Sequence, residues 1–408
     1  MKSLFLKIVK KNSILVLAIS VLLANCTQSI KKNDIENDGI RTIDIISYIS
    51  KTQKVNLSTV ASNIEYCILE TDTNCLMRNN YLHCIGDYFV SIEDYCYVFE
   101  RKSGKFVRQI GNLGQGPDDY QDGYKVIGDK IVLYGNGYYL FYNIDGTLSH
   151  KFNIKTGRVG NIAYKEFHVG YIDNRTGNET IRIGFFDKKT GELMESIPNY
   201  RSFKLIKREF VEADYSFHKF NNNLFYKDFY DDTLYHIKDF ALQPRYLFDT
   251  GGRTVPYGSQ GQGGRYDITA AATGRDYDRY GKYIVIEDIL EDTNFLYFTF
   301  NYNRMTYRAI YNKTVDEILI MPPVSISWMD VSRGLAALPL FGFENDLDGG
   351  LPFWPIHMIS DREMMYVYKA EELLELDVSK ITDEKLKKLL NSINEDSNPV
   401  VAIVTLKN

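Results

Sequence analysis

The stretch that decides the fold runs from Gly86 to Gly111 and reads GDYFVSIEDYCYVFERKSGKFVRQIG. It contains three short runs of aromatic and β-branched residues, and the last two runs are separated by a turn with Ser103 and Gly104. Residues of these types favour strands, and a glycine supplies the positive φ that a tight hairpin turn requires. The stretch therefore predicts an antiparallel meander of three strands.

The same pattern recurs along the chain. It returns from Ile127 and from Tyr164, each time with a glycine turn before the last strand, and weaker copies begin at His218, Lys282 and Pro355. Small sheets repeated at intervals of about forty residues or more bury their faces only between neighbouring sheets, as they do in a β-propeller. The six copies predict an all-β, six-bladed β-propeller over residues 56–408. Two sandwich domains are the alternative, but they do not explain the recurring order of strands and turns.

Both ends of this region carry one further strand. Residues 62–69 read SNIEYCIL, and residues 398–407 read NPVVAIVTLK. Between residues 383 and 394, leucines recur at helical spacing, so we expect a short C-terminal helical insertion before the closing strand. We also expect one terminal strand to complete a blade that begins at the other end of the chain, because this closure removes exposed strand edges.

The N-terminus has the features of an export signal. Lysines at positions 2, 7, 10 and 11 precede an apolar run from Ile14 to Ala24, and Cys26 follows. The run is short for a membrane span and is typical of a cleaved signal peptide, here residues 1–25. The segment 26–55 begins with polar residues of mixed charge, and we expect it to form a flexible tether.

Composition argues against nucleic-acid binding. The chain has 48 basic and 53 acidic residues, so its formal net charge is −5 and no basic surface for nucleic acid is indicated. Aromatic residues make up 14% of the sequence, which fits strand and core packing.

Four cysteines remain after Cys26. These are Cys67, Cys75, Cys84 and Cys96. In an oxidising location they either form one disulfide or remain free thiols, and the sequence leaves both states open.

The first meander is followed by GNLGQGPDDY, residues 111–120, and a second motif, NDLDGGLPFWP, occupies residues 345–355. The first motif resembles the G-x-G-x-G-P-x-E-[FY] joint between blades in a family of six-bladed β-propeller lipoproteins of the Bacteroidota, which is distantly similar to NHL propellers. The second motif and the closing strand are similar to that family as well. Asp119 stands where the family usually has glutamate.

The sequence before Cys26, Leu-Ala-Asn, resembles a lipobox, in which the cysteine is acylated. The resemblance implies export to the cell envelope and a lipid anchor at Cys26, at the outer membrane, on either its periplasmic face or the cell surface. It implies little chemistry, because a fold alone does not determine function.

The residues of GNLGQGPDDY also predict a turn without the resemblance. Gly114 and Gly116 allow the chain to turn, Pro117 stiffens the exit, and Asp119 is placed to accept backbone N–H bonds. A phosphate-binding loop would require a helix directly after the glycines, whereas a strand-like run follows here. We therefore interpret this motif as structural.

We interpret the NDLDGG motif as a structural turn, with a calcium site as the alternative. NDLDGG places oxygen ligands at Asn345, Asp346 and Asp348, as at the start of a calcium loop, but the later ligands of such a loop are missing. No other metal or cofactor is predicted.

Two further features are candidates for ligand binding. Arg253, Arg265 and Arg275 surround or lie within a glycine-rich stretch between the fourth and fifth repeats, where their cations suit an acidic sugar or a peptide carboxylate. Trp354 is either a stacking platform for a sugar ring or a buried packing residue.

Taken together, these features favour a binding module over an enzyme, with a glycan or a peptide as ligand at one mouth of the central channel. No catalytic residue is predicted. A hydrolase or lyase with carboxylates and histidines gathered from several blades is one alternative. A structural partner in an outer-membrane uptake complex is the other, and it predicts a flat apolar patch.

Overall fold

The computed structural model describes residues 40–92, 95–174, 176–204, 215–259, 281–325, 340–381 and 383–407. The chain divides into two units, residues 1–40 and residues 41–408, and the fold below is that of the second unit. The predicted signal peptide and Cys26 lie outside the described residues. None of the helices in the described part has the length and apolar character needed to cross a membrane.

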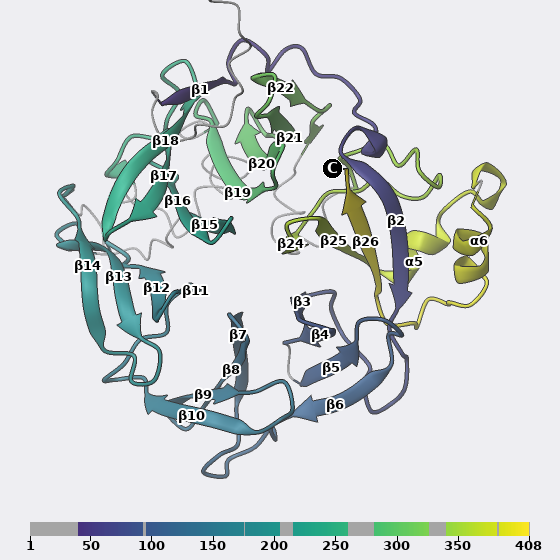
Figure 1. The fold of residues 1–408 in the computed structure, drawn as a ribbon, viewed down its shortest axis with the longest axis horizontal. Coiled ribbons are helices and arrows are strands. Elements are labelled where there is room, and N and C mark those ends of the chain that lie inside the picture. Colours follow the sequence, from purple (N-terminus) through teal and green to yellow (C-terminus); the bar gives the residue numbers. More distant parts are fainter. Residues whose placement is uncertain are drawn as a thin grey trace, which may run out of the picture. The chain divides into compact units, whose positions relative to one another are not determined.

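The second unit is a ring of six antiparallel sheets, which confirms the six-bladed β-propeller (Figure 1). In blades 1 to 5 the first strand of the meander lies nearest the centre of the ring, and its next three strands lie successively further out. Blade 1 contains β3 (Leu82–Ile85), β4 (Tyr88–Ser91), β5 (Cys96–Glu100) and β6 (Phe106–Ile110). Blade 2 contains β7 (Asp122–Ile127), β8 (Lys130–Gly135), β9 (Tyr138–Tyr142) and β10 (Leu148–Asn153).

The next three blades repeat this order. Blade 3 contains β11 (Ile162–Tyr164), β12 (Phe167–Tyr171), β13 (Ile181–Asp187) and β14 (Leu193–Pro198). Blade 4 contains β15 (Tyr215–Phe220), β16 (Asn223–Asp228), β17 (Thr233–Lys238) and β18 (Ala241–Asp249). Blade 5 contains β19 (Val285–Glu291), β20 (Phe295–Tyr302), β21 (Met305–Asn312) and β22 (Glu317–Ile320), and the short β23 (Val324–Ser325) also pairs with β21.

Blade 6 is assembled from both ends of the propeller. It contains β24 (His357–Ser360), β25 (Glu363–Tyr368), β26 (Val400–Leu406) and, on the outside, β2 (Ala61–Ile68). Ile64 of β2 lies opposite Val404 of β26 in an antiparallel register. The expected closure of the ring by terminal strands is therefore confirmed.

The predicted helical insertion lies between β25 and β26. It contains α5 (Ala370–Leu374), the 3₁₀ turn η4 (Val378–Lys380) and α6 (Glu384–Leu390). Asp383 caps α6 by accepting a hydrogen bond from the backbone N–H of Leu386 at 2.8 Å. The helix buries Leu386, Leu389 and Leu390, which is the leucine spacing seen in the sequence.

The core consists of apolar clusters between neighbouring blades. Val98 of blade 1 packs in one cluster with Leu133 of blade 2, and Phe185 of blade 3 packs in another with Leu224 of blade 4. A blade removed from the ring would expose both faces to water, so the blades stabilise one another.

An additional strand precedes the propeller proper. β1 (Arg41–Asp44) pairs in parallel with β18, so it forms a fifth strand on the outer edge of blade 4. Ile43 and Ile45 are buried against this blade, and Val55 is buried further along. We assigned residues 26–55 to a tether, but residues 41–55 belong to the folded unit, because their apolar side chains are buried in it.

The four described cysteines are all free thiols. Three are buried, and burial raises the pKa of the Cys96 thiol to about 12 and that of Cys67 to about 11. Of the two states left open by the sequence, the structure therefore has the free one, in which cysteine serves as a small apolar residue.

Candidate functional site

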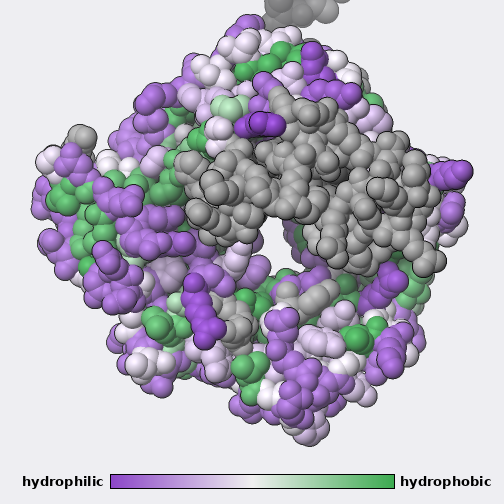
Figure 2. Space-filling view, turned by 180° about the vertical axis from the view of Figure 1, so that it is seen from behind, coloured by the Kyte–Doolittle hydropathy of each residue, from purple (hydrophilic) through white to green (hydrophobic). Residues whose placement is uncertain are grey.

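The innermost strands all begin on the same face of the ring, which we call the entry face. It is defined by the first residues of these strands, namely Leu82, Asp122, Ile162, Tyr215, Val285 and His357. Because neighbouring strands are antiparallel, the connections between blades and the turns between second and third strands also lie on this face. Figure 2 shows that the ring is open at its centre. Binding residues of a scaffold of this kind are expected on such connections.

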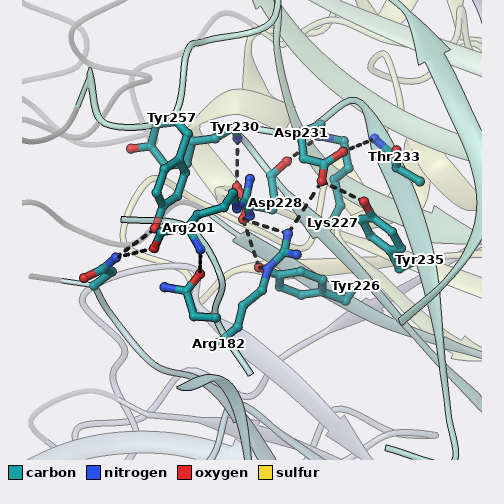
Figure 3. A network of polar contacts seen from close by, with 12 residues as sticks. Arg182, Arg201, Tyr226, Lys227, Asp228, Tyr230, Asp231, Thr233, Tyr235 and Tyr257 are labelled. Carbon is teal, nitrogen blue, oxygen red and sulfur yellow. Dashed lines mark hydrogen bonds and ion pairs between the residues drawn. The ribbon is translucent and has the colours of Figure 1, made fainter. Parts of the chain in front are cut away.

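A buried carboxylate at the entry face joins blade 3 to blade 4 (Figure 3). Asp228 ends β16, and its side chain is 1% exposed. Its Oδ2 atom accepts hydrogen bonds from Arg182 of β13 at 3.0 Å, from Arg201 and from the hydroxyl of Tyr226 at 3.3 Å. Its Oδ1 atom accepts from the backbone N–H of Tyr230 at 2.8 Å. The carboxylate is thus saturated by donors from two blades.

The charges of this network nearly balance. Asp231 lies 3.7 Å from Arg182 and accepts a hydrogen bond from the hydroxyl of Tyr235 at 2.7 Å, so two aspartates face two arginines. Burial by itself lowers the pKa of Arg182, but Tyr226 and the charges of Asp228 and Asp231 outweigh burial and raise this pKa. The arginine pair is therefore neutralised within the protein and does not favour an acidic ligand.

Lys227 holds the turn beneath the network. Its side chain is buried, and its Nζ donates to the backbone carbonyls of Asp228, at 2.6 Å, and of Asp231. Burial lowers the pKa of this amine to about 8. The lysine keeps the β16–β17 turn in the conformation that presents Asp228 to the two arginines.

Beside the network, three residues form what we call the mouth cluster: Asn161, Tyr171 and Tyr215. The rings of Tyr171, at the end of β12, and Tyr215, at the start of β15, stack with centroids 4.7 Å apart. The amide of Asn161 donates to the hydroxyl of Tyr215 and accepts from the backbone N–H of Tyr171 at 3.0 Å. Burial raises the pKa of Tyr215 to about 12, so its phenol is neutral at pH 7.

The mouth cluster is braced from both sides. The ring of Tyr226 lies 6.2 Å from that of Tyr171, which links the cluster to the arginine network. On the other side, Lys125 of β7 donates to the backbone carbonyl of Gly160 at 2.9 Å, next to Asn161. Burial lowers the pKa of Lys125 to about 8. The cluster therefore presents aromatic, phenol and amide groups, which are half-buried and held rigidly.

A second contact fixes the long connections of the entry face. The guanidinium of Arg201 lies 4.4 Å from the centroid of Tyr257, and Asn174 donates to the hydroxyl of Tyr257 at 2.8 Å. The segment after β18 is thereby attached to the segment after β14.

Of the three predicted arginines, the structure describes only Arg253. Arg253 donates to the backbone carbonyl of Gly251 at 3.3 Å, and this turn lies against Ile46, just after the outermost strand β1. Arg265 and Arg275 lie outside the described residues. The backbone carbonyl of Arg253 accepts a hydrogen bond from the N–H of Ile284 at 2.8 Å, directly before β19.

Trp354 is a packing residue in this structure. It is 5% exposed, stacks on Phe343 with centroids 5.6 Å apart, and has Tyr297 at its edge. Arg308 lies 5.3 Å from its ring. Because the side chain is buried among these residues, the ring is not available to stack on a sugar.

The NDLDGG loop connects the closing blade to the N-terminal segment. Asp346 accepts from the backbone N–H of Ser58 at 2.9 Å and from its hydroxyl, and Asp348 accepts from the backbone N–H of Gly350 at 2.8 Å. Asn345 donates to the hydroxyl of Tyr66 at 3.4 Å. In the described ranges, no three His, Cys, Asp or Glu side chains are grouped to hold a metal ion. The proposed calcium ligands are thus engaged in contacts within the protein.

The GNLGQGPDDY joint is a turn built around Asp119. The carboxylate of Asp119 accepts from the backbone N–H of Gly116 at 2.7 Å. A Cβ atom at Gly114 or Gly116 would lie 2.5 or 2.7 Å from that carboxylate. The two glycines are therefore needed for the close approach of Asp119, rather than for the turning freedom that we expected from them.

The sequence profile of the family "Domain of unknown function (DUF4934)" matches residues 40–405. The chain belongs to this family. No curated protein has a matching sequence. Among solved structures, the DUF4934 chain is similar to a candidate exported protein from Bacteroides fragilis, with 18% identity and a TM-score of 0.64, over 91% of this chain and 100% of that one. This likeness supports the propeller fold alone.

A member of the DUF4221 family from Bacteroides vulgatus is a more distant neighbour of the DUF4934 chain. It has 14% identity and a TM-score of 0.47, over 85% of this chain and 97% of that one. Such a low score carries no argument about function.

Sequence reasoning did not find the arginine network or the mouth cluster. Their members come from six separate stretches, around Asn161, Tyr171, Arg182, Arg201, Tyr215 and Tyr226, and each stretch looks like an ordinary strand end. The one local signal was the acidic run after β16, where Asp228, Asp231 and Asp232 follow buried aromatic residues.

Proposed function

We propose that the DUF4934 chain is an exported binding protein that takes a glycan or a peptide at the entry face, on the mouth cluster of blades 3 and 4. Export is supported by the N-terminal signal pattern. Acylation of Cys26 and attachment to the outer membrane are part of this proposal.

The observation that carries the proposal is the stacked pair Tyr171 and Tyr215, hydrogen-bonded through Asn161 at the inner edge of the ring. Ligand sites typically combine aromatic side chains with a few fixed polar groups. The phenol and amide groups offer donors and acceptors for hydroxyl and amide groups of a ligand. Rigid bracing by Tyr226 means that little conformational entropy is lost on binding.

The ligand class follows from the charge balance. Because Asp228 and Asp231 neutralise Arg182 and Arg201, an acidic sugar gains little from these cations. We therefore place neutral glycans first and peptides second.

Binding is tested by the melting temperature of the purified protein in the presence of neutral glycans, acidic glycans and peptides. A ligand at a hundredfold excess over its Kd adds about 2.7 kcal/mol to the stability. We expect a shift with a neutral glycan that is lost in Tyr171→Ala and retained in Tyr48→Ala, which removes a phenol from the segment after β1. A shift that survives Tyr171→Ala would place the site elsewhere, and no shift with any of these ligands would contradict the proposal.

A further inference from the structure

Two histidines from neighbouring blades meet at the inner edge of the ring. His83 is the second residue of β3 in blade 1, and His357 is the first residue of β24 in blade 6. Figure 1 shows that both strands border the centre of the ring, on the side away from β11 and β15. The imidazole centroids are 5.3 Å apart, with an angle of 39° between the ring planes.

This separation suits a shared metal ion. An ion bound to an imidazole nitrogen at about 2.1 Å lies about 3.2 Å from the centroid of the ring, so two imidazoles on one tetrahedral ion have centroids about 5.2 Å apart. The observed distance of 5.3 Å agrees with this value.

The ring of His357 is held by a backbone contact. One of its nitrogens forms a hydrogen bond with the backbone of Leu82, the residue before His83. A backbone partner on one imidazole nitrogen orients the ring for coordination by the other.

The ring nitrogens of His83 are available to a ligand. In the part of the chain that the structure describes, no hydrogen bond occupies either of its nitrogens, and both histidines are only partly buried. A solvated ion entering the channel therefore reaches the pair without displacing a protein contact of His83.

We propose that His83 and His357 form an open binding site for a late first-row divalent ion such as Zn²⁺ or Ni²⁺. Imidazole ligands suit these ions, whereas calcium and magnesium prefer oxygen. Within the described ranges no third His, Cys, Asp or Glu side chain joins the pair, so water or a donor atom of a ligand in the channel completes the coordination. A bound ion links blade 1 to blade 6 and does not depend on the proposed glycan site.

The direct test is calorimetric titration of the purified protein, without an oligohistidine tag, with ZnCl₂ and with NiCl₂. We expect one ion per chain, with affinity reduced at least tenfold in His83→Gln and in His357→Gln. The control is His236→Gln in β17, which removes a histidine whose ring stacks near Phe225 and should leave the affinity unchanged. Titration with CaCl₂ should show no heat of binding for any of these proteins.

A second measurement does not depend on the folding of variants. The electron paramagnetic resonance spectrum of the unsubstituted protein with one equivalent of bound Cu²⁺ should show hyperfine coupling to two imidazole nitrogens. Absence of zinc and nickel binding, a spectrum with no nitrogen coupling, or unchanged affinity in both glutamine variants would overturn the proposal.

Discussion

Arg182 of β13 donates a hydrogen bond to Asp228 of β16 over 3.0 Å and thereby ties blade 3 to blade 4. Other neighbouring blades are joined by apolar clusters and by similar pairs, such as Arg245 of blade 4 with Glu291 of blade 5. A buried charge pair fixes the lateral position of two blades, because a small displacement leaves both charges without partners.

The first prediction concerns this pair. Asp228→Asn removes the charge that neutralises Arg182 and Arg201, so we expect it to lower the free energy of unfolding by about 3–5 kcal/mol. Urea denaturation measures this loss. Asp118→Asn is the matched control, because Asp118 pairs with Lys151 at 2.6 Å but is 61% exposed, and it should cost less than about 1 kcal/mol. Equal losses in the two variants would contradict the argument.

The second prediction concerns acid. Burial lowers the pKa of His168 and of His83 to about 4, whereas the unfolded chain binds these protons near pH 6.5. Stability is therefore lost as the pH falls from about 6.5 to 4. Burial alone would raise the pKa of Glu291, but His218 and the cations Arg245 and Lys313 lower it to about 2, so a further loss follows between about pH 4.5 and 2.

The pH dependence is measured as the melting temperature between pH 3 and pH 8. In His168→Gln, the loss of folding free energy between pH 6.5 and 4 should be smaller by about 3 kcal/mol, since each unit of pKa difference corresponds to about 1.4 kcal/mol. It should leave the loss of stability below pH 4.5, which comes from Glu291, in place. A curve that is unchanged by this substitution would show that His168 titrates normally in the folded protein.

The third prediction compares two turn glycines that both have positive φ. A Cβ atom at Gly104, φ +71°, would lie 1.8 Å from the backbone oxygen of Ile68, whereas at Gly137, φ +81°, it would meet no atom within 4 Å. Gly137→Ala should lower the free energy of unfolding only by the cost of holding an alanine at positive φ, about 1–2 kcal/mol. Gly104→Ala should cost at least about 1 kcal/mol more, because the turn of blade 1 must move away from β2. Chemical denaturation of both variants checks this ranking.

The fourth prediction concerns the N-terminal strand. Ile43→Asp places a charge in a buried position of β1, and we expect the segment 41–55 to detach while the six blades stay folded. Limited proteolysis should then cleave within this segment and leave a stable fragment. Thr42→Asp, at an exposed position of the same strand, should remain protected. Global unfolding of Ile43→Asp would show instead that β1 is part of the cooperative core.

The blades could be predicted from sequence because each one carries its own local signal, a glycine turn between two strand-like runs, as at Gly104 and Gly191. The strand β1 could not be predicted, because four residues give too little periodicity, and its partner β18 is distant in sequence. The mouth cluster could not be predicted either, because its residues are distant in sequence. Tyr171 and Tyr215 meet only after two blades have packed together, and the propensities of neither residue encode this contact.

The closure of blade 6 also sets an order of events in time. β2 precedes β3 to β25 along the chain, whereas its partner β26 follows them. The edge of β2 therefore stays without this partner until β26 has been synthesised. A variant that lacks β26 would hold almost all of its blades and still be an open arc, with the edge of β2 available to the wrong partner.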